Sequence, residues 1–143
     1  MARRFPLAGL LRLRHAEQDR AAAALAAANE RMRDAADART AARRTLDDTA
    51  SAMPVEDAAT LSAVAAARAA TRGMLEELDA VVRTRRADAD RAQGEYNAAR
   101  RSALGLEKLE EQHTVQATAE ELRTEQNALD EIAARSRGEG GAR

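Results

Sequence analysis

The side chains that could perform chemistry are few and scattered along this 143-residue sequence. Its two histidines, His15 and His113, have no second histidine three or four residues away, so neither has the spacing of a helical metal site. The sequence contains no glycine-rich phosphate loop and no nucleophile in a triad context. Acidic pairs such as Asp47–Asp48 are typical of solvated helix surface. We therefore expect no catalytic residue, no cofactor, no metal and no small-molecule substrate.

The charges and the start of the chain narrow the remaining classes of protein. Its 23 basic and 24 acidic residues give a formal net charge of −1. Basic clusters such as residues 83–86 are interleaved with acids, which argues against a nucleic-acid partner. Arg12 and Arg14 interrupt the apolar start, which is then too short for a membrane span. With no cysteine in the chain, these features predict a cytoplasmic protein.

Alanine dominates the composition and predicts the fold class. The chain has 38 alanines, one phenylalanine, one tyrosine and no tryptophan, too little bulk for the core of a compact globule. Pro54 separates two predicted helices, at about 6–52 and 57–136. A short turn makes them antiparallel, so we expect an all-α fold, an elongated antiparallel two-helix coiled coil or helical hairpin. It forms one domain over 1–136, followed by a disordered tail, 137–143.

A seven-residue repeat of apolar and small side chains marks both predicted helices, as in a coiled coil. The first helix carries one row at Leu11, Gln18, Leu25, Met32, Arg39, Leu46 and Met53, and a second at Leu7, Arg14, Ala21, Ala28, Ala35, Ala42 and Thr49. The second helix carries Leu61, Arg68, Leu75, Val82, Ala89, Tyr96 and Ala103, with Val64, Thr71, Leu78, Arg85, Ala92, Ala99 and Leu106. Beyond Leu109 the phase changes, and a further stripe follows at Val115, Leu122, Leu129 and Ile132.

The unequal helix lengths leave two arrangements open. Either the second helix extends past the first, or residues 57–85 bend back so that the termini pair. Three interior glycines are candidate bends: Gly73, Gly94 and Gly105. Residues 1–14 hold four arginines and no acid, while residues 107–131 carry a net charge of −6, which favours bringing the ends together.

Local polar interactions should support the helices. Asp57 or Ser51 could cap the second helix. Oppositely charged side chains four residues apart should pair on the helix surface, and these are Asp79 with Arg83, Arg91 with Glu95, and Glu131 with Arg135.

Motifs at the two ends of the chain resemble a known family. The start, FPLAGLLRLRHAE at 5–17, follows the pattern F-x-L-x-x-L-L-x-L-R-x-x-E. The end contains LEKLEEQ at 106–112 and EQNALDEIAAR at 125–135. On a cysteine-free helical chain, these segments resemble the flagellar export protein FliJ family. Alanine replaces larger side chains through the middle of the sequence, which weakens the match at partner-binding positions there.

The resemblance implies a non-catalytic component of the flagellar type III export apparatus, similar to the stalk subunit of rotary ATPases. Such a protein would bind and stimulate the flagellar export ATPase ring, and would contact the export gate membrane protein and export chaperones. It would lie in the cytoplasm, peripherally associated with the inner face of the cell membrane at the flagellar base.

The resemblance also suggests which residues meet these partners. The paired ends would enter the ring, and the candidates there are Phe5, Leu7, Leu10, Leu11, Arg12, Arg14, Leu106, Leu109, Leu122 and Leu129, with Ile132. The middle of the chain would face the gate, and the candidates there are Leu75 and Leu78, with Val64 and Arg68.

Two other functions stay open from the sequence. One is a self-associating structural coiled-coil scaffold of cytoskeletal or division type, which would form a long stable dimer alone. The other is the equivalent stalk of a virulence-type secretion system. If the chain is a monomeric hairpin and binds an ATPase, the export function is favoured over the scaffold.

Overall fold

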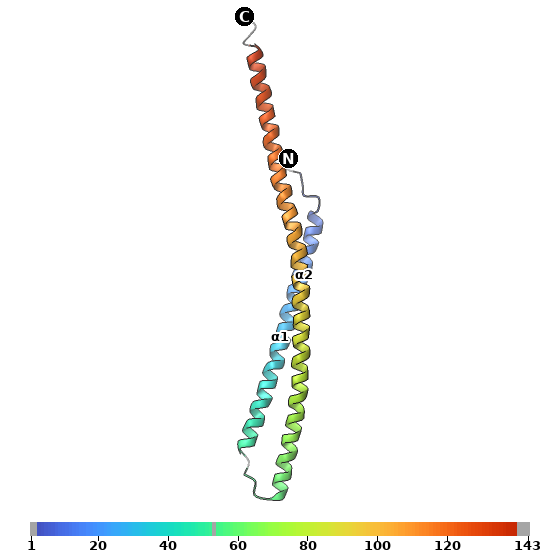
Figure 1. The fold of residues 1–143 in the computed structure, drawn as a ribbon, viewed down its shortest axis with the longest axis vertical. Helices are drawn as coiled ribbons and strands as arrows, with labels where there is room; N and C mark the ends of the chain where they lie inside the picture. Colours follow the sequence, from blue (N-terminus) through green and yellow to red (C-terminus); the bar gives the residue numbers. More distant parts are fainter. Residues whose placement is uncertain (1–2, 53, 140–143) are drawn as a thin grey trace. The chain divides into compact units, whose positions relative to one another are not determined.

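Two long helices make up the fold. The computed structural model describes residues 3–52 and 54–139. Helix α1 spans Ala8–Ala52 and helix α2 spans Ala58–Glu139, and they are 45 and 82 residues long (Figure 1). No strand occurs within the described ranges. The predicted all-α helical hairpin is confirmed, because the two helices run in opposite directions and pack against each other.

The ends of the helices follow the proline and capping signals. Helix α1 begins two residues after Pro6 and ends at Ala52, as predicted. Met53, at the end of one predicted row, lies outside the described residues. Helix α2 ends at Glu139, so residues 137–139 are helical where a tail was expected, and residues 140–143 lie outside the described part of the chain.

Asp57 is the residue that caps α2. The backbone N–H of Thr60 donates a hydrogen bond to Asp57 Oδ1 at 2.6 Å, and the N–H of Leu61 donates to the Asp57 carbonyl at 3.1 Å. Ser51, the other candidate, donates its hydroxyl to the Asp47 carbonyl within α1 at 3.1 Å. The N-terminal amides of α2 therefore find their acceptor in the residue just before the helix.

This cap gives a prediction about pH. Hydrogen bonds from Thr60 hold the pKa of Asp57 below its ordinary value of 3.8. A lowered pKa in the folded state means that the carboxylate stabilises the fold above pH 3.8, and this contribution is lost as the pH falls through the folded pKa. We expect the melting temperature of Asp57→Asn to lie below that of the wild type near neutral pH, with the gap closing in acid. Melts recorded across this range check it, and a gap independent of pH would contradict it.

The chain divides into two compact units, and each is described by itself. The turn unit consists of Gln18–Ala98. The end unit consists of Met1–Glu17 together with Ala99–Arg143. Each unit therefore pairs a length of α1 with a length of α2.

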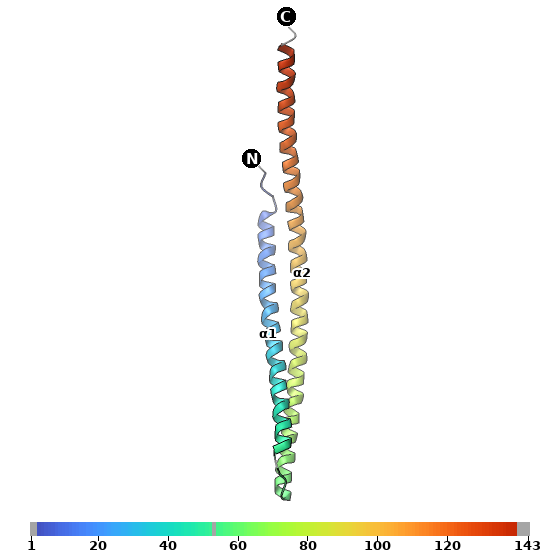
Figure 2. The ribbon, with the colours of Figure 1, turned by 90° about the vertical axis from the view of Figure 1, so that its left-hand side faces the viewer.

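The core of the turn unit is a thin seam of small side chains. Ala28 and Ala35 of α1 are 3% and 8% exposed, and Val64 and Ala89 of α2 are both 5% exposed. The two helical segments run side by side in both views (Figures 1 and 2). An ion pair between Arg39 and Asp79 joins them. Alanine rows let the helix backbones approach closely, as the heptads predicted.

Two predicted members of the α2 row in this unit do not join the seam. Leu61 is 56% exposed and Arg68 is also exposed, so the row at these positions faces solvent. Two of the three predicted i,i+4 pairs are also wrong, because Asp79 pairs with Arg39 across the helices and Arg91 pairs with Asp88 at 3.5 Å. The third is confirmed in the end unit, where Arg135 Nη2 lies 2.6 Å from Glu131 Oε1.

The end unit packs the start of the chain against α2. Leu11 is 6% exposed and Ala103 is fully buried at 0%. His15 Nε2 lies 2.7 Å from Glu107 Oε1. The ring of Phe5 meets the ring of His113 edge-on, with 5.6 Å between the centroids.

The predicted change of phase beyond Leu109 is wrong for the internal seam. Half-buried side chains continue the original rows at Glu110, His113 and Ala117. Val115 lies two residues from that seam, about 200° around the helix, and therefore faces away from the N-terminal segment. From 118 to 132 every side chain of α2 is exposed.

The longer helix therefore extends past its partner. Residues 57–85 do not bend back, since α2 is unbroken from Ala58 to Glu139. Within the end unit, the N-terminal segment reaches His113 through Phe5, whereas Leu129 and Ile132 are 66% and 64% exposed.

The interior glycines of α2 were candidate bends, but the backbone at these positions adopts no conformation that requires glycine. No described residue has a positive φ, and a Cβ added at Gly94 or Gly105 would meet nothing within 4 Å. Because alanine fits there and favours the helix, we expect Gly94→Ala and Gly105→Ala each to raise the free energy of unfolding by about 0.5–1 kcal/mol. Urea titrations followed by helical circular dichroism measure this, and a decrease in either variant would contradict it.

Candidate functional site

The first turns of α1 present leucines to solvent. Leu7, Leu10 and Leu13 are 39%, 38% and 49% exposed. Leu11 differs, because it points into the seam and is 6% exposed. Of the leucines that the sequence predicts to bind a partner here, Leu7 and Leu10 are on the surface and Leu11 belongs to the core of the end unit. Leu13 is a third surface leucine in the same segment.

The last third of α2 presents a row of large aliphatic side chains, which we call the α2 stripe. Its four residues are 61–66% exposed, and they are Val115, Leu122, Leu129 and Ile132. The first three are seven residues apart, which places them on one face of the helix. Leu106 is half-buried and Leu109 is 46% exposed, so these two candidates lie at the margin of the seam.

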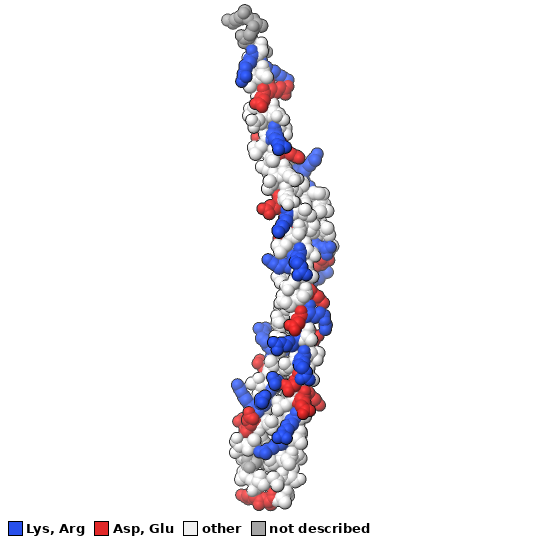
Figure 3. Space-filling view, in the orientation of Figure 1, with Lys and Arg blue, Asp and Glu red and all other residues white. Residues whose placement is uncertain are grey.

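Charged side chains surround this apolar surface. On the face of α2 seen in Figure 3, acidic and basic groups alternate with uncharged surface towards the C-terminal end of the helix. Arg12 is exposed, while Arg14 Nη1 pairs with Glu17 Oε2 at 2.8 Å within α1. Of the two candidate arginines, Arg12 is therefore the one free to meet a partner's charge without breaking a described ion pair.

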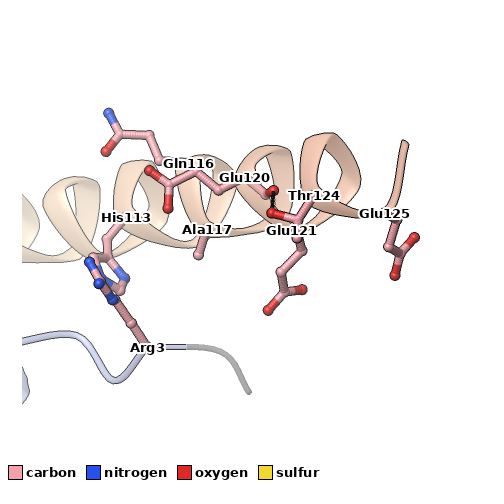
Figure 4. A pocket seen from close by; sticks show the side chains of 8 residues that line it. All are labelled: Arg3, His113, Gln116, Ala117, Glu120, Glu121, Thr124 and Glu125. Atoms are coloured by element: carbon pink, nitrogen blue, oxygen red, sulfur yellow. Dashed lines mark hydrogen bonds between the residues drawn. The ribbon is translucent and has the colours of Figure 1, made fainter. Parts of the chain in front are cut away.

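An open groove lies between the N-terminal segment and α2. Arg3 reaches towards the same side of α2 as His113 and Glu121 (Figure 4). The groove is lined by Arg3, His113, Gln116, Ala117, Glu120, Glu121, Thr124 and Glu125. The expectation that the basic start lies beside the acidic end is met at Arg3, which shares the groove with three glutamates.

The histidines have a role that the sequence did not indicate. His15, which is exposed, contacts Glu107 of α2, and His113, which is half-buried, contacts Phe5 of the N-terminal segment. A sequence signal existed for His113, since it lies seven residues after Leu106 in the predicted row. No such signal marked His15.

The candidates in the turn unit are less accessible. Val64 is 5% exposed and Leu75 and Leu78 are half-buried, so these three contribute mainly to the seam. The exposed aliphatic side chains of this unit lie elsewhere, at Val55, Leu61, Met74 and Val81. Met74 and Val81 each precede a predicted seam residue by one position. They therefore lie outside the heptad rows, and the sequence pattern does not mark them.

These surfaces are suited to protein–protein binding. Among residues 3–52 and 54–139 no group of three histidine, cysteine or acidic side chains could hold a metal ion. No helix in the described part is long and apolar enough to cross a membrane. What the end unit offers is apolar side chains flanked by charges, an arrangement typical of protein–protein contacts.

Comparison with known proteins agrees with the resemblance at the ends. The family model described as Flagellar FliJ protein matches residues 3–140. The match covers nearly the whole chain and includes residues of both units. No curated protein and no solved structure gives a significant match.

Proposed function

The chain belongs to the flagellar FliJ family, and from this premise we propose that it binds and stimulates the flagellar export ATPase ring as a non-catalytic stalk. Membership makes it a component of the flagellar export apparatus. The end unit, with its exposed leucines and its α2 stripe, is the part that contacts the ATPase. The motifs FPLAGLLRLRHAE and EQNALDEIAAR lie in this unit.

The observation that supports this assignment most strongly is the exposure of the α2 stripe. Leu122 and Leu129 are 61% and 66% exposed. Leaving a large aliphatic side chain in water forgoes about 1.5–3 kcal/mol relative to burying it. Several such residues on one face mark a surface that a partner covers.

The thickness of this part of the protein suits a ring pore. Beyond Ala117 the exposed side chains of α2 belong to a single helix, which is about 10–12 Å across with its side chains. A helix of that width enters a narrow opening that excludes a globular domain. The flanking charges at Arg12 and along residues 120–131 would set orientation and association rate more than affinity.

The other partners are assigned to the turn unit. The export gate membrane protein would contact the exposed aliphatic side chains Leu61, Met74 and Val81, next to the candidates Leu75 and Leu78. Export chaperones would use the same accessible surfaces. The protein would then work in the cytoplasm, held at the inner face of the membrane at the flagellar base by these contacts.

The test is a titration of the chain into the purified flagellar export ATPase. We expect ATP turnover to rise to a plateau, while the chain alone hydrolyses no ATP. In Arg12→Glu the stimulation should fall and its salt dependence weaken, because a charge that faces the ATPase has been reversed. Since Arg12 is exposed, its stability should change by no more than about 0.5 kcal/mol.

The matched control is Arg20→Glu, a reversal at an exposed residue of α1 in the turn unit. It should stimulate like the wild type. Turnover that ignores saturating wild-type chain would refute the proposed function. A folded Arg12→Glu variant with unchanged stimulation would move the contact away from the start of α1.

A further inference from the structure

The α2 stripe has the pattern of a coiled-coil seam, but within the described chain nothing packs on it. We infer that it pairs with the stripe of a second copy of this chain, in antiparallel orientation. The contact covers about residues 119–136. It goes beyond the function proposed above and does not depend on it, although the same leucines serve both.

The sequence around the stripe has the alternating 4–3 spacing that a two-helix seam requires. Large residues occupy one seam position at Val115, Leu122 and Leu129, and the other position holds Ala119, Gln126 and Ala133. The hairpin itself is built from the same combination of aliphatic and alanine rows, with Ala28, Ala35 and Ala89 buried. Ala119 and Ala133 are small enough to let two such helices approach closely, whereas Gln126 is a larger, polar member of the row.

Charges beside the stripe select one antiparallel register. When Gln126 lies level with Leu129 of the second copy, Leu122 lies level with its Ala133. Arg123 then lies beside Asp130 of the second copy, and by symmetry this attraction occurs twice. A shift of one heptad in one direction places Arg123 beside Arg123 of the second copy. A shift in the other direction places Asp130 beside Asp130 of the second copy. Both neighbouring registers are therefore repulsive.

The same charges disfavour a parallel pair. In a parallel coiled coil a flanking residue meets the residue five positions later on the other helix. Glu125 would then meet Asp130 of the second copy, a like-charge contact that also occurs twice. The antiparallel register instead places Glu125 beside the uncharged Ile132.

The charge gradient along the segment favours the same orientation. The segment starts with Glu120 and Glu121 and ends with Arg135, which also pairs with Glu131 of its own helix at 2.6 Å, and only an antiparallel pair brings Arg135 level with the acidic start of the second copy. The pairing also leaves the hairpin intact, because the stripe lies about 200° around α2 from the seam that holds the N-terminal segment.

The expected complex is weak and reversible. An overlap of about 18 residues is about 27 Å long at the helical rise, which places the interface at the small end of the size range. Because Leu122 and Leu129 are covered in it, the dimer and an ATPase complex through the same leucines exclude each other.

The test is sedimentation of the full chain over loading concentrations from about 10 μM to about 1 mM. We expect the wild type to pass from monomer to dimer. Arg123→Asp and Asp130→Arg should each weaken the dimer about tenfold, because both attractions become repulsions. An equimolar mixture of these two variants should dimerise again, since every contact in the mixed pair joins opposite charges. The double variant R123D/D130R should also dimerise alone.

The control is Asn127→Arg, which changes charge on the opposite face of the helix and should dimerise like the wild type. If the wild type stays monomeric at every loading concentration, the inference is wrong, and a different protein must cover the α2 stripe. A dimer that survives both single reversals assigns the contact to another surface. Stronger dimerisation of Asp130→Arg alone indicates a parallel pair and overturns the antiparallel one.

Discussion

Replacing Ala103 with leucine is expected to lower the free energy of unfolding by about 1–3 kcal/mol. Ala103 is fully buried where α2 packs against the start of α1. The seam there is closely packed because its residues are small, so a leucine must push the helices apart or adopt a strained rotamer. A two-helix protein has no second layer that could absorb the displacement.

Urea denaturation followed by circular dichroism measures this loss. Ala134→Leu is the matched control, because Ala134 is exposed on the same helix and should change stability by less than about 0.5 kcal/mol. If the two substitutions had equal effects, Ala103 would not be packed as the structure describes.

The double variant Leu122→Gln/Leu129→Gln is expected to lose ATPase stimulation while its melting temperature stays unchanged. Both leucines are more than 60% exposed, so replacing them leaves no cavity. If the ATPase buries both, losing about 3 kcal/mol of apolar contact weakens binding by more than about a hundredfold. Titration into the ATPase, with turnover as the readout, measures the shift.

Met74→Gln is the control, since Met74 is 55% exposed but lies in the turn unit. It should stimulate like the wild type. Comparing Arg123→Asp with the double variant R123D/D130R separates this effect from self-association, because both keep the two leucines and only the first disrupts the dimer. Wild-type stimulation by the double variant would show that the α2 stripe does not meet the ATPase.

The periodic features of the fold were predictable because they are local. Alanine content and the heptads predicted two helices, and the seam contains Leu11, Ala28 and Ala103 as the rows require. Pro54 located the turn, and Asp57 was one of two predicted caps. Each of these signals lies within a few residues of the structure that it determines.

Features that depend on register between the helices were not predictable. Asp79 was expected to pair with Arg83 on its own helix, but Arg39 comes level with it on the other helix. The contacts of His15 and His113 arise in the same way. Local spacing does not say which residues of two antiparallel helices lie side by side.

Which of the candidate residues are exposed could be predicted only in part, because exposure also depends on the register between the helices. Leu122 and Leu129 are exposed as a partner contact requires, whereas Leu11, Leu75 and Leu78 fill or border the seam. Aliphatic residues at heptad spacing look alike whether they face the other helix or solvent. The point along α2 that the start of α1 reaches decides whether such a residue faces the other helix or solvent, and this point is known only from the folded hairpin.

The most direct test of the ATPase contact is site-specific photo-crosslinking with the purified ATPase. A photoreactive side chain is placed at Leu129 in one variant and at Met74 in another, both exposed positions. We predict that the label at 129 crosslinks to the ATPase and that unlabelled wild-type chain competes it away, while the label at 74 does not crosslink. Crosslinking from 74 and none from 129 would contradict the assignment of the ATPase contact to the end unit.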